Sequence, residues 1–158
     1  MRILIDTNVV LDVLMARQPH VDHALAIFSL VDSGRVRGVL GATTITTVFY
    51  LATKGVGPPE ARAHVRSLLD LFDVATVDRA VLVAALDAGF DDLEDAVLHE
   101  AAVVAGVDAI VTRDGAGFAA ASLPVFTPSA FLAAVHGEQP RKLSPTAGGV
   151  RPERRDQP

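Results

Sequence analysis

Short apolar runs alternate with longer helix-like segments along most of this chain, and this alternation is the strongest constraint on its fold. The strand-like runs lie at Arg2–Asp6, Val36–Leu40, Val74–Val77, Ala109–Thr112 and Val125–Phe126. Repeated strand–helix alternation favours a parallel sheet with right-handed crossovers. Val, Ala and Leu dominate and aromatic residues are few, which suits a sheet buried on both faces. We predict an α/β protein, a three-layer α/β/α sandwich with a central parallel sheet of four to five strands.

Helix-breaking and helix-capping residues place most of the predicted helix ends. Gly34 and Gly106 are predicted to end the helices before them, and Asp78 is predicted to cap the helix after it. The segment 44–54 is rich in β-branched residues, but the Gly and Pro residues that follow it indicate a helix end. The predicted helices lie at Asn8–Ala16, His20–Ser33, Thr44–Lys54, Pro59–Leu71, 79–88, Asp92–Ala105 and Pro128–Val135.

The absence of cysteine excludes disulfides and zinc–thiolate sites, and it fits a reducing cytoplasm. The apolar N-terminus, Met1–Ile5, meets Asp6 at once and is too short for the apolar region of a signal peptide. No apolar stretch approaches the length of a membrane span. We therefore predict a cytoplasmic protein with no membrane segment.

Charge and composition change near residue 137. Residues 1–137 hold 9 Lys/Arg and 16 Asp/Glu, whereas residues 138–158 hold 5 basic and 3 acidic residues. We predict a domain over residues 1–136 and a flexible Pro/Gly/Arg-rich tail over residues 137–158. An acidic body is not typical of a general nucleic-acid binder, so bound divalent cations would have to offset its repulsion of RNA.

Several acids fall where parallel strands end or helices begin. Asp6 ends the first strand, and Asp114 lies just beyond the strand at 109–112. Asp92 and Asp95 open a helix and share one face of it. Ligands bind parallel sheets at the carboxyl ends of the strands. Carboxylates that converge there repel one another unless a cation joins them, and oxygen ligands without Cys select Mg²⁺ or Mn²⁺ over Zn²⁺.

Three stretches resemble the PIN-domain family and its VapC-like toxin ribonucleases. They are ILIDTNVVLDVL near the start, DDLEDAVLHEAAVVAGVDAIVTRDGAGF, and PVFTPSAFLAA. The resemblance covers roughly residues 1–136, and its motifs occur in the family's order. It implies a PIN fold and cleavage of RNA phosphodiester bonds with Mg²⁺ or Mn²⁺.

Carried over by position, Asp6, Asp95 and Asp114 match the catalytic, metal-binding acids of the family. Asp92 matches a frequent further metal-binding acid, but its place as a helix N-cap explains it equally well. The other acids have simpler explanations too: a strand-end residue or cap for Asp6, a helix N-terminal charge for Asp95, and a turn residue for Asp114. Asp91 and Glu94 are expected to be solvated.

Four further residues match supporting positions of the family. Asn8 corresponds to the polar residue that assists the first acid, and Thr112 and Arg113 precede the last one. Thr47 stands where many PIN nucleases carry a Glu. Arg113 either contacts phosphate or pairs with an acid, and we favour the pair.

Two more residues near these positions are expected to be structural. Asp12 is at least as well explained by a structural bond as by metal binding. A lone helical histidine such as His99 is more often structural than a ligand.

The leading hypothesis is an Mg²⁺- or Mn²⁺-dependent endoribonuclease that acts as the toxin of a type II toxin–antitoxin pair. The resemblance implies an RNA substrate, a small antitoxin that covers the acidic site, and often a homodimer. The alternative is a PIN-fold RNA- or protein-binding module with weakened catalysis, which Thr47 favours. A phosphatase that uses Asp6 as nucleophile is disfavoured, because Asn8 stands where a second acid is needed.

Overall fold

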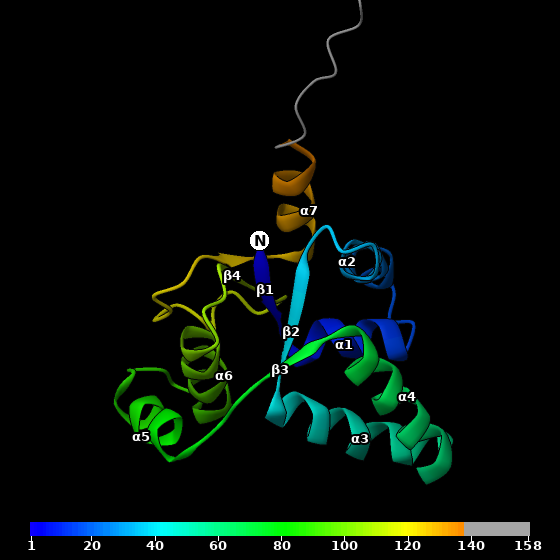
Figure 1. Cartoon of the computed structure of the whole chain (residues 1–158), viewed down its shortest axis with the longest axis horizontal. Coiled ribbons are helices and arrows are strands. Elements are labelled where there is room, and N and C mark those ends of the chain that lie inside the picture. Colours follow the sequence, from blue (N-terminus) through cyan, green and yellow to red (C-terminus); the bar gives the residue numbers. More distant parts are fainter. Residues whose placement is uncertain (138–158) are drawn as a thin grey trace, which may run out of the picture.

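A five-stranded sheet forms the centre of the molecule in the computed structural model, which describes residues 1–137 (Figure 1). The strands are β1 (Arg2–Ile5), β2 (Arg37–Gly41), β3 (Asp73–Ala75), β4 (Ala109–Val111) and β5 (Val125–Phe126). Their order is β3-β2-β1-β4-β5, and every pair of neighbours is parallel. The carboxyl ends of all five strands therefore lie at one edge of the sheet, and the predicted fold class is confirmed.

The predicted helices are all present, with ends that shift by one or two residues. They are α1 (Thr7–Leu14), α2 (Val21–Asp32), α3 (Ala42–Val56), α4 (Pro58–Leu71), α5 (Arg79–Asp87), α6 (Leu93–Val104) and α7 (Pro128–Gly137). The predicted tail begins at Gly137, which ends α7, and its remaining residues lie outside the described part of the chain. No helix among the described residues is long and apolar enough to cross a membrane.

The two faces of the sheet carry different helix layers. Ile3 and Ile5 face a core shared with α1, α2, α3, α4 and α7, whereas Leu4 faces a second core shared with α5 and α6. This alternation follows from the two-residue repeat of a strand. Figure 1 shows the two layers on opposite sides of the central strands. The carboxyl edge of the sheet therefore lies between the two helix layers.

One glycine lets α6 approach that edge closely. A Cβ atom at Gly41, the last residue of β2, would lie 2.4 Å from Cδ1 of Leu98 in α6. Only a residue without a side chain fits there. The close approach brings the first turn of α6 next to the ends of β1 and β2.

Candidate active site

A cavity of about 250 Å³ opens at the carboxyl edge of the sheet and is lined by Asp6, Asp95 and Asp114. We call it the acid cavity. Its other lining residues are Thr7, Asn8, Leu11, Arg17, Thr47, Glu94 and Leu98. The structure thus brings together three acids, of which the first, Asp6, and the last, Asp114, lie more than a hundred residues apart in the sequence. Their place at strand ends and at a helix start agrees with the placement predicted from the sequence.

Three different elements deliver the three carboxylates. Asp6 follows β1 and is the N-cap residue of α1, whereas Asp95 lies in the first turn of α6. Asp114 lies in the turn after β4, where its Oδ1 accepts a hydrogen bond from the N–H of Gly117 at 3.1 Å. A Cβ atom at Gly117 would lie 2.5 Å from Oδ2 of Asp95 and 3.2 Å from Oδ2 of Asp114. The missing side chain at Gly117 therefore leaves room for both carboxylates.

The hydroxyl of Thr112 joins the ends of β1 and β4. It donates a hydrogen bond to Oδ2 of Asp6 at 2.6 Å and accepts one from the backbone N–H of Asp114 at 2.9 Å. Thr112 is fully buried. One side chain thus sets the position of the first acid relative to the last, which explains why a threonine precedes Asp114 by two residues.

Asn8 completes this network from α1. Its amide nitrogen donates to Oδ2 of Asp6 and to the hydroxyl of Thr112, and its Oδ1 accepts from the backbone N–H of Arg113 at 3.2 Å. The amide is therefore occupied by bonds within the protein. Asn8 holds Asp6 in place rather than reaching out to a ligand.

Two of the carboxylates have raised pKa values. Burial raises the pKa of Asp6, which is 7% exposed, and the negative charge of Asp114 adds to it, while the hydrogen bond from Thr112 lowers it. Burial also raises the pKa of Asp95 to about 6, helped by the charges of Asp6, Asp92 and Asp114. Within residues 1–137 neither carboxylate forms an ion pair, although Arg17 also lines the cavity, and this favours the binding of a cation.

The donor set fits a hard cation that keeps much of its water. Within residues 1–137, no three His, Asp or Glu side chains lie close enough together to hold a metal ion by themselves. Mg²⁺ is commonly bound through one or two carboxylates with several waters retained. The carboxylates that line the cavity and the raised pKa values of Asp6 and Asp95 suit such an ion.

Two of the residues singled out in the sequence lie differently around the cavity. Oδ1 of Asp92 accepts hydrogen bonds from the N–H groups of Glu94 and Asp95, so it caps α6, and it does not line the cavity. Thr47 does line the cavity, on α3, opposite the acids of the other elements. Its position there is consistent with the alignment to the family's Glu.

Arg113 forms an ion pair with a buried acid, as expected. Its Nε lies 2.7 Å from Oδ2 of Asp12, which is fully buried, although the N–H is not aligned well enough for a hydrogen bond. Asp12 therefore has a structural partner and does not line the acid cavity. His99 is structural too: its buried ring accepts a hydrogen bond from the backbone N–H of Ser122 and contacts Glu100.

Sequence reasoning missed two charged residues that line the acid cavity, Arg17 and Glu94. Arg17 lies in the loop after α1, and nothing in its sequence context marks it. Glu94 was expected to be solvated, and it is indeed exposed while it lines the cavity. Its place beside Asp95 in the first turn of α6 was the only available signal.

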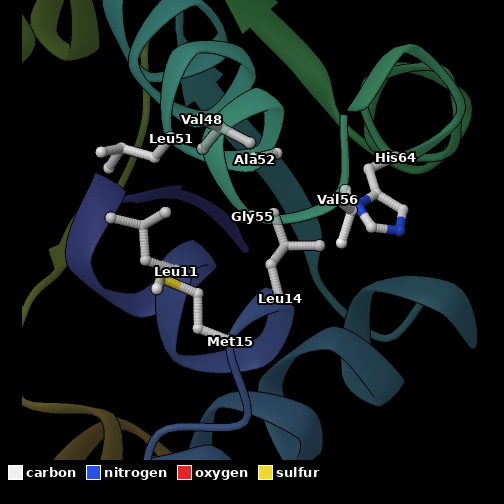
Figure 2. A pocket seen from close by; sticks show the side chains of 9 residues that line it. All are labelled: Leu11, Leu14, Met15, Val48, Leu51, Ala52, Gly55, Val56 and His64. Carbon is white, nitrogen blue, oxygen red and sulfur yellow. The ribbon is translucent and has the colours of Figure 1, made fainter. Parts of the chain in front are cut away.

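An apolar cavity of about 80 Å³ lies between α1, α3 and α4. Figure 2 shows Leu11, Leu14 and Met15 facing Val48, Leu51 and Val56 across it, with His64 at one side. Leu11 lines both this cavity and the acid cavity. An apolar surface therefore adjoins the acids.

Comparison with known proteins gives one family match. A PIN-domain family model matches residues 2–116. No curated protein matches the chain.

Several solved structures share the fold. VapBC2 from Rickettsia felis, bound to a DNA fragment from its promoter, aligns with a TM-score of 0.62 at 10% identity over 80% of this chain and 98% of that one. A toxin–antitoxin complex from Klebsiella pneumoniae aligns with a TM-score of 0.59 at 20% identity over 79% and 96%. VapBC-1 from nontypeable Haemophilus influenzae aligns with a TM-score of 0.62 at 13% identity over 82% and 99%.

Proposed function

This chain belongs to the PIN-domain family, and from that premise we propose that it is a metal-dependent endoribonuclease, the toxin of a type II toxin–antitoxin pair. The observation that carries the proposal is the convergence of Asp6, Asp95 and Asp114 on one cavity. Asp6 and Asp95 have raised pKa values, and within residues 1–137 neither forms an ion pair. A cavity of this kind is suited to bind a cation that also contacts the phosphodiester of a substrate.

In this proposal Asp6, Asp95 and Asp114 are the catalytic residues and together hold Mg²⁺ or Mn²⁺, one or two of them directly and the others through water on the ion. The bound ion would activate water for attack on phosphorus and stabilise charge on the phosphoryl oxygens. Thr112 and Asn8 position Asp6 through their hydrogen bonds. Asp92 acts on the site through its charge and through the cap that holds the first turn of α6.

Two residues on the rim would contact the substrate side of the cavity. The hydroxyl of Thr47 is placed to accept or donate a hydrogen bond but adds no negative charge. The guanidinium of Arg17 lines the same cavity and is suited to a non-bridging phosphate oxygen. Both groups would orient RNA without taking part in proton transfer.

The proposed partner is a small antitoxin that covers the acid cavity. The similar structure from Klebsiella pneumoniae is a toxin–antitoxin complex. In the present chain, apolar side chains of the antitoxin would occupy the cavity between α1, α3 and α4, because that cavity shares Leu11 with the acid cavity. A homodimer in the cytoplasm is part of the same proposal.

A second candidate is a PIN-fold binding module for RNA or protein with weakened catalysis. Thr47 favours it, because the cavity lacks the acid that many PIN nucleases carry at this position. Such a module would bind a cation and RNA without cutting the strand.

Calorimetry of Mn²⁺ binding, with cleavage of a mixed RNA pool run in parallel, tests these functions. Asp6→Asn and Asp95→Asn are compared with wild type, and Asp91→Asn, an exposed acid outside the cavity, is the control. We expect the two cavity variants to lose Mn²⁺ binding and cleavage together while the control keeps both. Mn²⁺ binding without cleavage would favour the binding module, and no Mn²⁺ binding by wild type would rule out the metal-dependent nuclease.

A further inference from the structure

A second polar cavity, of about 230 Å³, lies beside Arg113 and is lined by hydrogen-bond donors without any carboxylate. We call it the Arg113 cavity. Its lining residues are His20, His23, Arg113, Thr127, Pro128 and Ser129. The domain around it carries many more acidic than basic residues, so a cavity lined by no carboxylate is a place where an anion can bind without repulsion from the lining. An anion entering it would meet N–H and O–H donors and no carboxylate among the lining side chains.

Arg113 forms an ion pair with a buried acid that does not line the cavity. The buried Asp12 lies 2.7 Å from its Nε. Within residues 1–137, its two terminal Nη atoms have no hydrogen-bond partner. An arginine fixed in this way presents its terminal N–H groups in the geometry that suits two oxygens of a phosphate.

The other lining residues add donors from the start of α2, where His20 and His23 lie, and from the start of α7, where Thr127 and Ser129 lie. Neutral His20 and His23 each carry one ring N–H. The hydroxyls of Thr127 and Ser129 lie 3.2 Å apart, and the Thr127 hydroxyl accepts a hydrogen bond from the N–H of Ala130. The N–H of Ser129 lies in the first turn of α7, where backbone N–H groups have no partner within a helix.

The sheet places the Arg113 cavity next to the acid cavity. Arg113 follows β4, between Thr112 and Asp114, and Thr127 follows β5, the neighbouring strand. The N–H of Thr112 donates to the carbonyl of Phe126 at 3.0 Å, which fixes the two loops side by side. The two cavities therefore follow each other along the carboxyl edge, the first with acids and the second with donors.

We propose that the Arg113 cavity binds a backbone phosphate of the RNA at a distance along the strand from the bond that is cut. This inference rests on the proposed ribonuclease function, because that function is the reason to take RNA as the ligand. An RNA strand with one phosphate at the acid cavity carries further phosphates along its backbone, and the adjoining Arg113 cavity offers them donors and no carboxylate. Because Asp12 compensates the charge of Arg113, recognition depends on hydrogen bonds more than on net charge.

The first test is NMR of the histidine ring protons in the full chain during titration with inorganic phosphate. We expect the signals of His20 and His23 to shift in a saturable way. His136, exposed near the end of α7 and outside the cavity, is the internal control. Equal shifts at all three histidines, or none at His20 and His23, would overturn the proposal.

The second test measures affinity for a short single-stranded RNA of mixed sequence, without reference to cleavage. His20→Ala with His23→Ala removes both ring N–H donors and should weaken binding by about tenfold, the loss expected for hydrogen bonds to a charged group. Ser129→Glu, at an exposed position, should weaken it further by placing a carboxylate in the cavity. His136→Ala, outside the cavity, should bind as wild type does.

The outcomes separate this inference from the function on which it rests. Weaker RNA binding by the cavity variants of a protein that never cuts RNA would support the phosphate site and reject the nuclease. Cleavage with an unchanged KM in those variants would reject the phosphate site and keep the nuclease. If an acidic peptide shifts His20 and His23 whereas RNA does not, the cavity serves a protein partner and the proposal is wrong.

Discussion

The acid cavity and the Arg113 cavity have similar volumes and lie at the same edge of the sheet. They differ in whether the charged side chains that line them form an ion pair within the protein. The carboxylates of Asp6 and Asp95 form no ion pair within residues 1–137, and their pKa values are raised. The guanidinium of Arg113 has the buried Asp12 directly behind it. A charge without an internal partner needs an external one, whereas a paired charge is free to act through its remaining hydrogen-bond donors.

The largest expected effect comes from breaking the Arg113–Asp12 pair. Arg113→Met should lower the free energy of unfolding by about 3–5 kcal/mol, because it leaves the fully buried Asp12 charge unpaired. Asp73→Asn, which breaks the exposed pair with Arg2, should cost at most about 1 kcal/mol. Urea unfolding measures both. The double change Arg113→Met with Asp12→Leu should recover much of the loss, and an equally mild effect of Arg113→Met and Asp73→Asn would refute the role of the pair.

A smaller effect is expected at the junction between β1 and β4. Thr112→Val removes the hydroxyl that bonds Asp6 and the N–H of Asp114, so the free energy of unfolding should fall by about 1–3 kcal/mol. Thr112→Ser keeps the hydroxyl and should lose less. Thermal unfolding compares them, and equal losses in the two variants would show that packing of the methyl group, not the hydroxyl, matters here.

Adding a carboxylate to the acid cavity should increase the difference in charge between it and the Arg113 cavity. Thr47→Glu should raise Mn²⁺ affinity by about tenfold, or about 1.4 kcal/mol, because a further carboxylate then faces the cation. Thr46→Glu, on the exposed side of α3, is the matched control. Calorimetry measures both affinities. An unchanged affinity in Thr47→Glu would contradict the alignment of this helix with the family.

The smallest effect concerns pH in the absence of metal. Because the pKa of Asp95 is raised to about 6 from 3.8, its contribution to stability is complete below about pH 3.8 and is lost as pH rises through about 6. Asp95→Asn should therefore be more stable than wild type above pH 7, by less than about 1 kcal/mol, since solvent screens this partly exposed group.

Thermal unfolding in a chelator from pH 4 to 8 measures this difference between Asp95→Asn and wild type. Saturating Mg²⁺ should reduce it, because the ion removes the repulsion between the carboxylates. A difference that stays constant with pH would show that the variant acts on packing.

Much of the fold was predictable because its signals are local. Gly34, Gly106 and the cap at Asp78 mark helix ends through backbone conformation and a single hydrogen bond, and the structure has helix boundaries at each of these positions. The meeting of Asp6 and Asp114 was also predictable, since two adjacent parallel strands bring their ends together. The metal-binding and catalytic roles of these residues stay predictions.

The rest depended on contacts that sequence does not encode locally. The start of α2, with His20 and His23, meets Thr127 and Arg113, and no spacing along the chain predicts that meeting. Asp92 matched both a cap and a metal ligand by position, and only the geometry of its bonds to Glu94 and Asp95 distinguishes its place in the fold. Thr47 was placed beside the acids only through resemblance.

The junction at Thr112 has a consequence for the newly made chain. Asp6 leaves the ribosome early, but the hydroxyl that fixes it belongs to a residue 106 positions later. Domains are synthesised from the N-terminus over seconds, and β1 can pair with β4 only when both have emerged. A nascent chain therefore cannot assemble the acid cavity until nearly the whole described domain has been made, and an interrupted synthesis leaves a fragment without that cavity.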